Sequence, residues 1–184
     1  IMSRRIDVSK FGMIYAGAQK NLGPSGLALV IIRRDLVART PEKVPTMLKY
    51  ATYTENNSLY NTPPTFGIYM IGLVTDWIKE VGGLAELEKV NDAKAALLYQ
   101  AIDDSNGFYS TPVKKCSRSK MNVVFRLPTE ELEAKFLELV KANGMIGLKG
   151  HRSVGGMRAS IYNAMPMEGV EKLVTLMNEF RKNN

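Results

Sequence analysis

The chain has 184 residues, of which 45% are hydrophobic and 23% charged, a composition typical of a globular protein with one domain or two small ones. Cys116 is the only cysteine, which excludes an intramolecular disulfide and fits a reducing compartment such as the cytoplasm. His151 is the only histidine, so the chain has few of the ligands that metal sites use, which argues against a metal site. No apolar run is long enough to cross a bilayer, so we expect no membrane partner. The net charge is +7, but the basic residues are scattered along the chain and form no arginine-rich tract. We therefore expect small anionic ligands and no nucleic acid, although mild basicity also occurs in proteins without such ligands.

The chain opens with the pattern of two buried strands joined by a turn. Residues 13–18 are short, apolar and uncharged, and residues 27–32 are rich in aliphatic and β-branched side chains. The Gly-Pro-Ser-Gly sequence at 23–26 predicts the turn between the two strands.

An irregular segment and two helices follow. Residues 39–64 contain four prolines and are expected to lack regular structure. Thr65 is expected to cap a helix over 66–81, which the Gly-Gly pair after it ends. Apolar residues at helical spacing predict a second helix over 84–103.

The last third predicts a small α+β domain. Val123, Phe125 and Leu127 alternate as one face of a strand, and residues 128–143 then form a helix that Gly144 terminates. Short strands are expected at 145–148 and 157–162, and Pro166 starts a final helix. Strands and helices in this order are typical of a layered α+β unit.

Lys20 is the first candidate for chemistry. It is the only charged residue between Phe11 and Ile32, and it lies where the first predicted strand gives way to a glycine turn. Ligands of α/β sheets gather at the carboxyl ends of strands, and a partly desolvated lysine is more readily neutral, so its amine can attack a carbonyl. This position suits Schiff-base chemistry, but a lysine that reaches solvent from an ordinary turn shows the same pattern.

Two loops carry side chains suited to anions. Asn61 and Thr62 precede a predicted helix start, where polar side chains and backbone N–H groups can bind a phosphate; an ordinary capped loop is the alternative. His151 and Arg152 lie in a glycine-rich loop, and Arg158 begins the apolar strand after it. Arginine forks match carboxylates and phosphates in two-pronged geometry. The alternatives are a strand-edge ion pair for Arg158 and an ordinary surface position for His151.

Four segments together resemble the phosphoserine aminotransferases, which are class-V, fold type I pyridoxal-phosphate enzymes. They are YAGAQKNLGP at 15–24, YNTPPT at 60–65, GHR at 150–152 and GMRASIYNA at 156–164, in family order across nearly the whole chain. The resemblance implies an α/β fold in two parts. Residues 1–85 would be the carboxy-terminal part of the cofactor-binding large domain, and residues 86–184 a small α+β carboxy-terminal domain.

The resemblance implies how the cofactor is held. Lys20 would bind pyridoxal 5'-phosphate as a Schiff base and act as the catalytic residue, and Gln19 would contact the cofactor phosphate. Asn61 and Thr62 would reach the same phosphate in the neighbouring subunit's site, which implies a homodimer with shared active sites.

The resemblance also implies the substrates. Arg158 would hold the α-carboxylate, while His151 and Arg152 would lie near the substrate phosphate. The implied reaction moves an amino group from glutamate to 3-phosphohydroxypyruvate and yields phosphoserine and 2-oxoglutarate in serine biosynthesis. Bacterial relatives also process a phosphorylated precursor of pyridoxine.

The sequence departs from the family at its front. The family's earlier half supplies a glycine turn for the cofactor phosphate, an aromatic residue stacked on the ring and an aspartate for the pyridinium nitrogen. None of these is found in this chain, so we expect a piece of a longer protein that is inactive alone. The alternatives are another aminotransferase of the same fold with a different anionic substrate, and a non-catalytic anion-binding domain.

Overall fold

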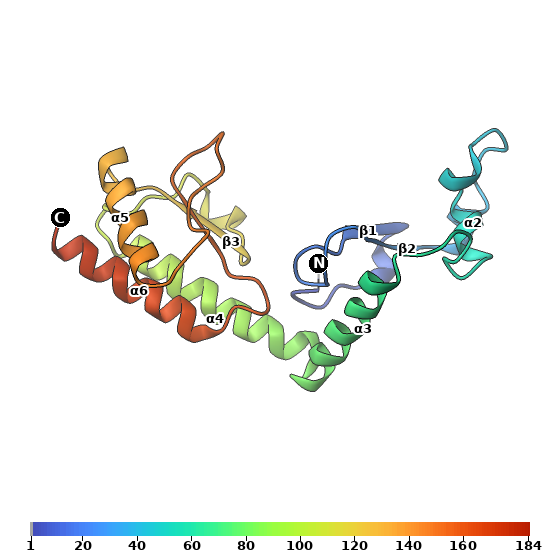
Figure 1. Cartoon of the computed structure of the whole chain (residues 1–184), viewed down its shortest axis with the longest axis horizontal. Coiled ribbons are helices and arrows are strands. Elements are labelled where there is room, and N and C mark those ends of the chain that lie inside the picture. The colour runs from blue at the N-terminus through green and yellow to red at the C-terminus, as the bar shows by residue number, and fades with distance from the viewer. Residues whose placement is uncertain (1) are drawn as a thin grey trace. The chain divides into compact units, whose positions relative to one another are not determined.

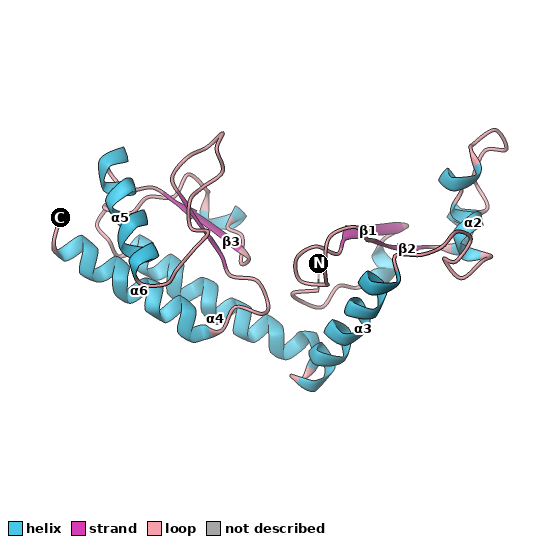
Figure 2. Cartoon of the chain, in the orientation of Figure 1, coloured by secondary structure: helices cyan, strands magenta, loops and turns pink. Residues whose placement is uncertain are grey.

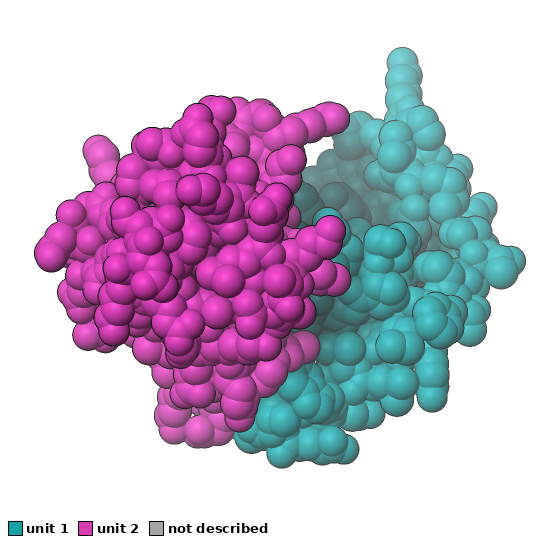
Figure 3. All heavy atoms as spheres, turned by 60° about the vertical axis from the view of Figure 1, so that its left-hand side comes forward, with its two compact units in different colours: residues 1–84 teal, residues 85–184 magenta. Residues whose placement is uncertain are grey.

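The computed structural model describes residues 2–184, and the chain divides into two compact units, Ile1–Leu84 and Ala85–Asn184 (Figure 3). Both units combine helices with short strands, which confirms the predicted mixture of α and β structure (Figure 2). The division falls next to the expected boundary at residue 85, while the assignment of the units to a large and a small domain stays a prediction. None of the helices in the described residues has the length and apolar character needed to span a bilayer.

The first unit is built on an antiparallel hairpin that precedes a long helix (Figure 1). The strands pair from Met13 with Ile32 to Gly17 with Ala28. The elements of this unit are η1 (Val8–Lys10), β1 (Met13–Gly17), β2 (Ala28–Ile32), α1 (Arg34–Val37), η2 (Thr46–Leu48), α2 (Tyr50–Thr54) and α3 (Thr65–Glu80).

The expectation that both strands are buried is wrong. Tyr15 is 76% exposed, and Val30 and Ile31 of β2 are about two-fifths exposed. Within residues 2–184, β1 and β2 pair only with each other, so neither strand has a second neighbour. An apolar sequence favours a strand, but its burial requires further strands or helices over its faces.

The segment between the hairpin and α3 is largely irregular, as predicted, with two short helical turns. The Thr52 hydroxyl donates to the Thr46 carbonyl at 2.7 Å and ties α2 to η2. Thr65 does not cap α3, because it is the first helical residue and its hydroxyl donates to the Pro63 carbonyl at 3.3 Å. Gly67 lets α3 approach the hairpin, since a Cβ there would overlap the side chain of Leu27.

The second unit packs helices against one face of a second antiparallel sheet. The strands pair from Asn122 with Ser160 to Phe125 with Met157. Its elements are α4 (Gly83–Asp103), which begins just before the division, η3 (Lys115–Ser117), β3 (Asn122–Phe125), α5 (Glu130–Ala142), β4 (Met157–Ser160) and α6 (Met167–Lys182). The core draws on α4, both strands, α5 and α6, with Phe125 and Phe136 almost fully buried.

Most of the elements predicted here are present, but one strand is not. The Thr129 hydroxyl caps α5 by accepting the Leu132 N–H at 3.3 Å, and Gly144 follows the helix with φ +79°. The expected strand at 145–148 is wrong, because Gly144 and Gly147 both have φ +79° and interrupt extended backbone. The Leu148 carbonyl accepts the Arg158 N–H at 2.7 Å, and an isolated bridge pairs the next residue, Lys149, with Met157 of β4.

Candidate active site

Lys20 lies in a tight turn after β1. The Ala18 carbonyl accepts the N–H groups of Lys20 at 2.6 Å and Gly23 at 2.8 Å, and the Ala18 N–H donates to the Leu27 carbonyl at 3.0 Å. Ala18 and Leu22 are buried and anchor the turn on both sides, whereas Gln19 and Lys20 are exposed. The turn therefore presents two polar side chains from a fixed backbone.

Asn61 and Thr62 lie in the loop that leads into α3, and both are exposed. The Asn61 side-chain amide donates to the Thr62 carbonyl at 3.1 Å. The N-cap position of α3 is Pro64, which makes no side-chain capping hydrogen bond in the described part of the chain. A helix start with its N–H groups not capped by a side chain, next to two short polar residues, is suited to an anion.

His151 and Arg152 lie at the exposed tip of a loop formed by residues 150–156. At its base, the Gly150 N–H donates to the Gly156 carbonyl at 2.7 Å. At its tip, the His151 carbonyl accepts the N–H groups of Val154 at 2.9 Å and Gly155 at 2.8 Å. The His151 Nδ1 also lies 2.7 Å from the Ser153 hydroxyl. Backbone and side-chain hydrogen bonds thus shape the loop that carries the two basic residues.

Arg158 lies on the face of β4 opposite the core. Its neighbours Met157 and Ala159 are buried in the core, so alternation places Arg158 and Ser160 on the other face. The Arg158 Nε is buried and has no hydrogen-bond partner within residues 2–184. A desolvated guanidinium nitrogen without an acceptor is a strong site for a carboxylate.

The same face of the sheet carries a polar cluster that sequence reasoning missed. The Asn122 side-chain oxygen accepts the hydroxyls of Ser160 at 3.2 Å and Tyr162 at 3.1 Å. A second set of polar contacts, also missed, lies beyond the end of β4, where the Lys94 ammonium of α4 donates to the Tyr162 carbonyl at 2.8 Å and the Asn91 amide donates to the Asn163 side chain at 2.9 Å. Polar residues three positions apart on an otherwise apolar helix face were the available signal for Asn91 and Lys94.

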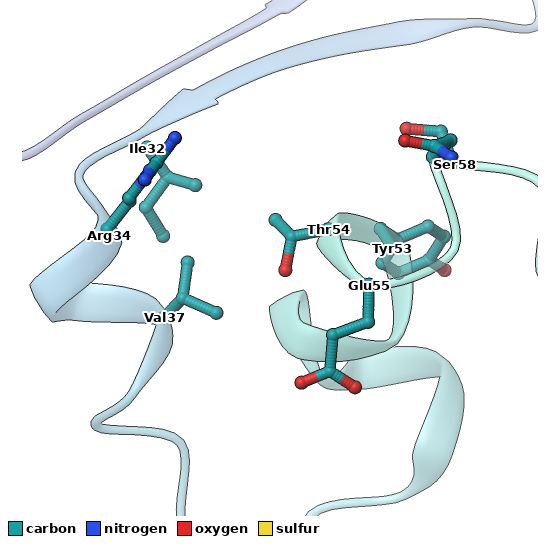
Figure 4. A pocket seen from close by; sticks show the side chains of 8 residues that line it. Ile32, Arg34, Val37, Tyr53, Thr54, Glu55 and Ser58 are labelled. Carbon is teal, nitrogen blue, oxygen red and sulfur yellow. The ribbon is translucent and has the colours of Figure 1, made fainter.

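The structure brings some of the predicted site residues together. In the second unit, the bridge between Lys149 and Met157 joins the base of the 150–156 loop to the strand that carries Arg158. In the first unit, Gln19 and Lys20 share one turn, while Asn61 and Thr62 lie in a separate loop. A pocket between β2–α1 and α2 contains none of the predicted residues and is lined by Ile32, Arg34, Val37, Tyr53, Thr54, Glu55, Asn57 and Ser58 (Figure 4).

Comparison with known proteins adds evidence that the geometry does not contain. The phosphoserine aminotransferase of Geobacillus kaustophilus (strain HTA426) is 60% identical over 182 residues, which are 99% of this chain and 51% of that protein. A solved structure described as showing radiation damage of the Schiff base in phosphoserine aminotransferase has a TM-score of 0.95 and 55% identity, with 100% of this chain and 51% of that chain covered.

A third comparison is with the pyridoxal-phosphate-bound phosphoserine aminotransferase of Trichomonas vaginalis. It has a TM-score of 0.90 and 42% identity, with 97% of this chain and 51% of that chain covered. The chain thus spans about half the length of the curated relatives it matches. The sequence profile described as Aminotransferase class-V matches residues 1–173, so the chain belongs to the class-V aminotransferase family.

Proposed function

We propose that this chain is the carboxy-terminal half of a phosphoserine aminotransferase, which transfers an amino group from glutamate to 3-phosphohydroxypyruvate. The observation that carries this proposal is the 60% identity with the Geobacillus kaustophilus protein of that name over 99% of the chain. The four segments at 15–24, 60–65, 150–152 and 156–164 support it, because they supply an amine and several anion-binding groups.

The residues present fit pyridoxal 5'-phosphate as the cofactor. Lys20 is an exposed residue whose amine suits an aldehyde, and the neutral donors of Gln19, Asn61 and Thr62 suit a phosphate. When bound, this cofactor supplies the electron sink for loss of the substrate α-proton. The Lys20 Nζ would hold the cofactor until the amine of glutamate displaces it, and the freed Nζ would then accept the α-proton of glutamate and later donate it.

Two anion-binding elements of the second unit fit the substrate. Arg158 has a buried Nε that finds no acceptor within residues 2–184, which suits the α-carboxylate common to every amino and keto acid. Arg152 and His151 lie at the exposed tip of the 150–156 loop, where they suit a phosphate. A phosphorylated hydroxythreonine precursor of pyridoxine carries the same two anionic groups, so we also propose it as a substrate.

Lys20→Ala in the complete protein that carries this chain tests the function. We expect loss of nearly all turnover of glutamate with 3-phosphohydroxypyruvate, and loss of the label that borohydride fixes at this position in the wild type. Lys49→Ala, in the same unit, is the matched control and should keep both. Normal turnover in Lys20→Ala would refute the assignment. Equal use of unphosphorylated keto acids by the wild type would indicate another class-V aminotransferase, and anion binding without turnover would indicate a binding domain.

We propose further that the complete protein is a cytoplasmic homodimer with shared sites, in which Asn61 and Thr62 serve the neighbouring subunit's cofactor. Their exposure in a loop after a proline-containing segment supports this, and the single cysteine fits a reducing compartment. The test is to co-refold Lys20→Ala chains with chains in which Asn61 and Thr62 are both Ala. About one site in four should then be intact, and activity should rise toward that fraction. No gain despite verified chain exchange would mean that both residues act within their own subunit.

A further inference from the structure

We infer that Arg126 is a positioning residue that holds the 150–156 loop in place and thereby sets the preference for phosphorylated substrates. The preference itself rests on the proposed function, whereas the hold on the loop rests on the contacts of Arg126. Arg126 follows β3 directly, and its backbone exchanges two hydrogen bonds with Ser110, at 2.7 and 3.0 Å. The start of its side chain is therefore fixed by the strand layer.

The guanidinium of Arg126 contacts the loop directly. Its NH1 donates to the Val154 carbonyl at 3.1 Å, and the Val154 N–H donates to the His151 carbonyl at 2.9 Å. Two successive hydrogen bonds thus connect Arg126 to the backbone of His151. Arg152 is the next residue along the chain, so the position of the loop tip depends on this connection.

Glu133 fixes the orientation of the guanidinium. Its carboxylate is almost buried, and its Oε1 accepts the Arg126 Nε at 2.6 Å and the Leu127 N–H at 3.3 Å. Hydrogen bonds to an ionised carboxylate are shorter and stronger than neutral ones, and the second bond, to the Leu127 N–H, fixes the position of the carboxylate. One guanidinium therefore links α5, through Glu133, to the carbonyl of the loop.

Two glycines allow the loop to lie against the Arg126 side chain. Gly155 and Gly156 have φ +74° and +67°, in the region that favours glycine. A Cβ on Gly156 would overlap the Arg126 Cδ and lie 2.8 Å from the Phe125 carbonyl, and one on Gly155 would lie 3.5 Å from the Arg126 NH1. This close approach and the hydrogen bond to Val154 independently indicate that the loop is seated on Arg126.

Loss of the Arg126 contacts should affect recognition of the substrate phosphate but not of the α-carboxylate. Loss of Arg126 should release the tip that carries His151 and Arg152. It should leave Arg158 in place, because the Arg158 N–H donates to the Leu148 carbonyl at 2.7 Å, outside the loop. Recognition of the phosphate should weaken, while recognition of the α-carboxylate persists. A displacement of about 1 Å in a positioning element can lower turnover by two orders of magnitude.

The test compares Arg126→Met, Arg126→Lys and a matched control, Arg118→Met, in the complete protein. Arg118 likewise pairs with a carboxylate, that of Asp103 at 2.7 and 2.8 Å, and within residues 2–184 none of its side-chain hydrogen bonds reaches the loop. The first readout is the ratio of kcat/KM for phosphoserine to that for serine in the amino-donor half-reaction. The second is hydrogen exchange at the amides of Val154 and Gly155, with the Arg158 amide as an internal reference.

We expect Arg126→Met to lower the substrate ratio by roughly tenfold or more and to speed exchange at Val154 and Gly155 only. Arg126→Lys should recover part of the substrate ratio and part of the exchange protection, because a cationic donor remains. Arg118→Met should have the substrate ratio and the exchange rates of the wild type. If Arg126→Met folds poorly because Glu133 loses its partner, Arg126→Met with Glu133→Gln removes the stranded charge and keeps an acceptor for Leu127. Unchanged exchange at Val154 and Gly155 would overturn the inference whatever the substrate preference, whereas a wild type without preference for phosphoserine would overturn the proposed function.

Discussion

Lys94 offers the sharpest test of how the second unit is held together. It is fully buried on α4, and its ammonium donates to the carbonyls of Tyr162 at 2.8 Å, Met165 at 2.9 Å and Ile161 at 3.3 Å. These carbonyls follow β4, so one side chain organises the turn between Arg158 and α6. Lys94→Met keeps the length and most of the volume of the side chain but removes all three hydrogen bonds.

Two opposing effects set the magnitude. A hydrogen bond to a charged group contributes about 1.5–3 kcal/mol, and a buried carbonyl left without a partner costs about 1–3 kcal/mol. The hydrogen bond to the Ile161 carbonyl is buried, whereas those to the Tyr162 and Met165 carbonyls are only part-buried. Burial lowers the pKa of Lys94, which indicates that desolvation of the ammonium offsets part of the gain. We therefore expect a net destabilisation of about 2–4 kcal/mol.

Native-state hydrogen exchange at the amides of β3 and β4 in the complete protein measures this loss within the second unit. Lys89→Met is the matched control, because Lys89 lies on the same helix in an exposed pair with Glu86 and should change stability by less than about 0.5 kcal/mol. Lys94→Met should also loosen the 161–165 segment more than the α5 amides. If Lys94→Met lowers the opening free energy no more than Lys89→Met does, the three hydrogen bonds do not stabilise the unit and the reasoning is refuted.

Two further predictions concern substrate recognition and alkaline pH. Arg158→Met should lower kcat/KM for all amino and keto acids by roughly one to two decades, whereas Arg152→Met should lower it mainly for phosphorylated substrates. Equal losses of kcat/KM for phosphorylated and unphosphorylated substrates in Arg152→Met would contradict this division. Burial raises the pKa of Tyr109, whose hydroxyl donates to the Met177 carbonyl at 2.8 Å. Above pH 10.0, the ordinary pKa of tyrosine, the unfolded chain releases a proton that the folded chain keeps, so the free energy of unfolding should fall as pH rises. The urea midpoint of Tyr109→Phe should therefore fall less steeply with pH than that of the wild type. Parallel falls of the two midpoints with pH would count against this.

The sequence alone determined much of the local structure. Helical periodicity predicted α4, while Pro128 and Gly144 predicted the limits of α5 and Pro166 the start of α6, because hydrophobic spacing and helix-end signals act between residues a few positions apart. The four motifs also led to the class-V aminotransferase family, which the family profile confirms over residues 1–173. The roles assigned to Lys20, Asn61 and Thr62 stay predictions, since they depend on a cofactor and a neighbouring subunit.

Only the tertiary structure decided which distant residues support the site. Lys94 lies 67 positions from Ile161, and Arg126 lies 28 from Val154, so no local pattern indicates either hydrogen bond. The exposure of the apolar hairpin was equally beyond the sequence, because burial depends on what else covers a strand. Local propensities act through neighbours along the chain, whereas buried ion pairs and close backbone approaches form only when the folded chain brings their partners together.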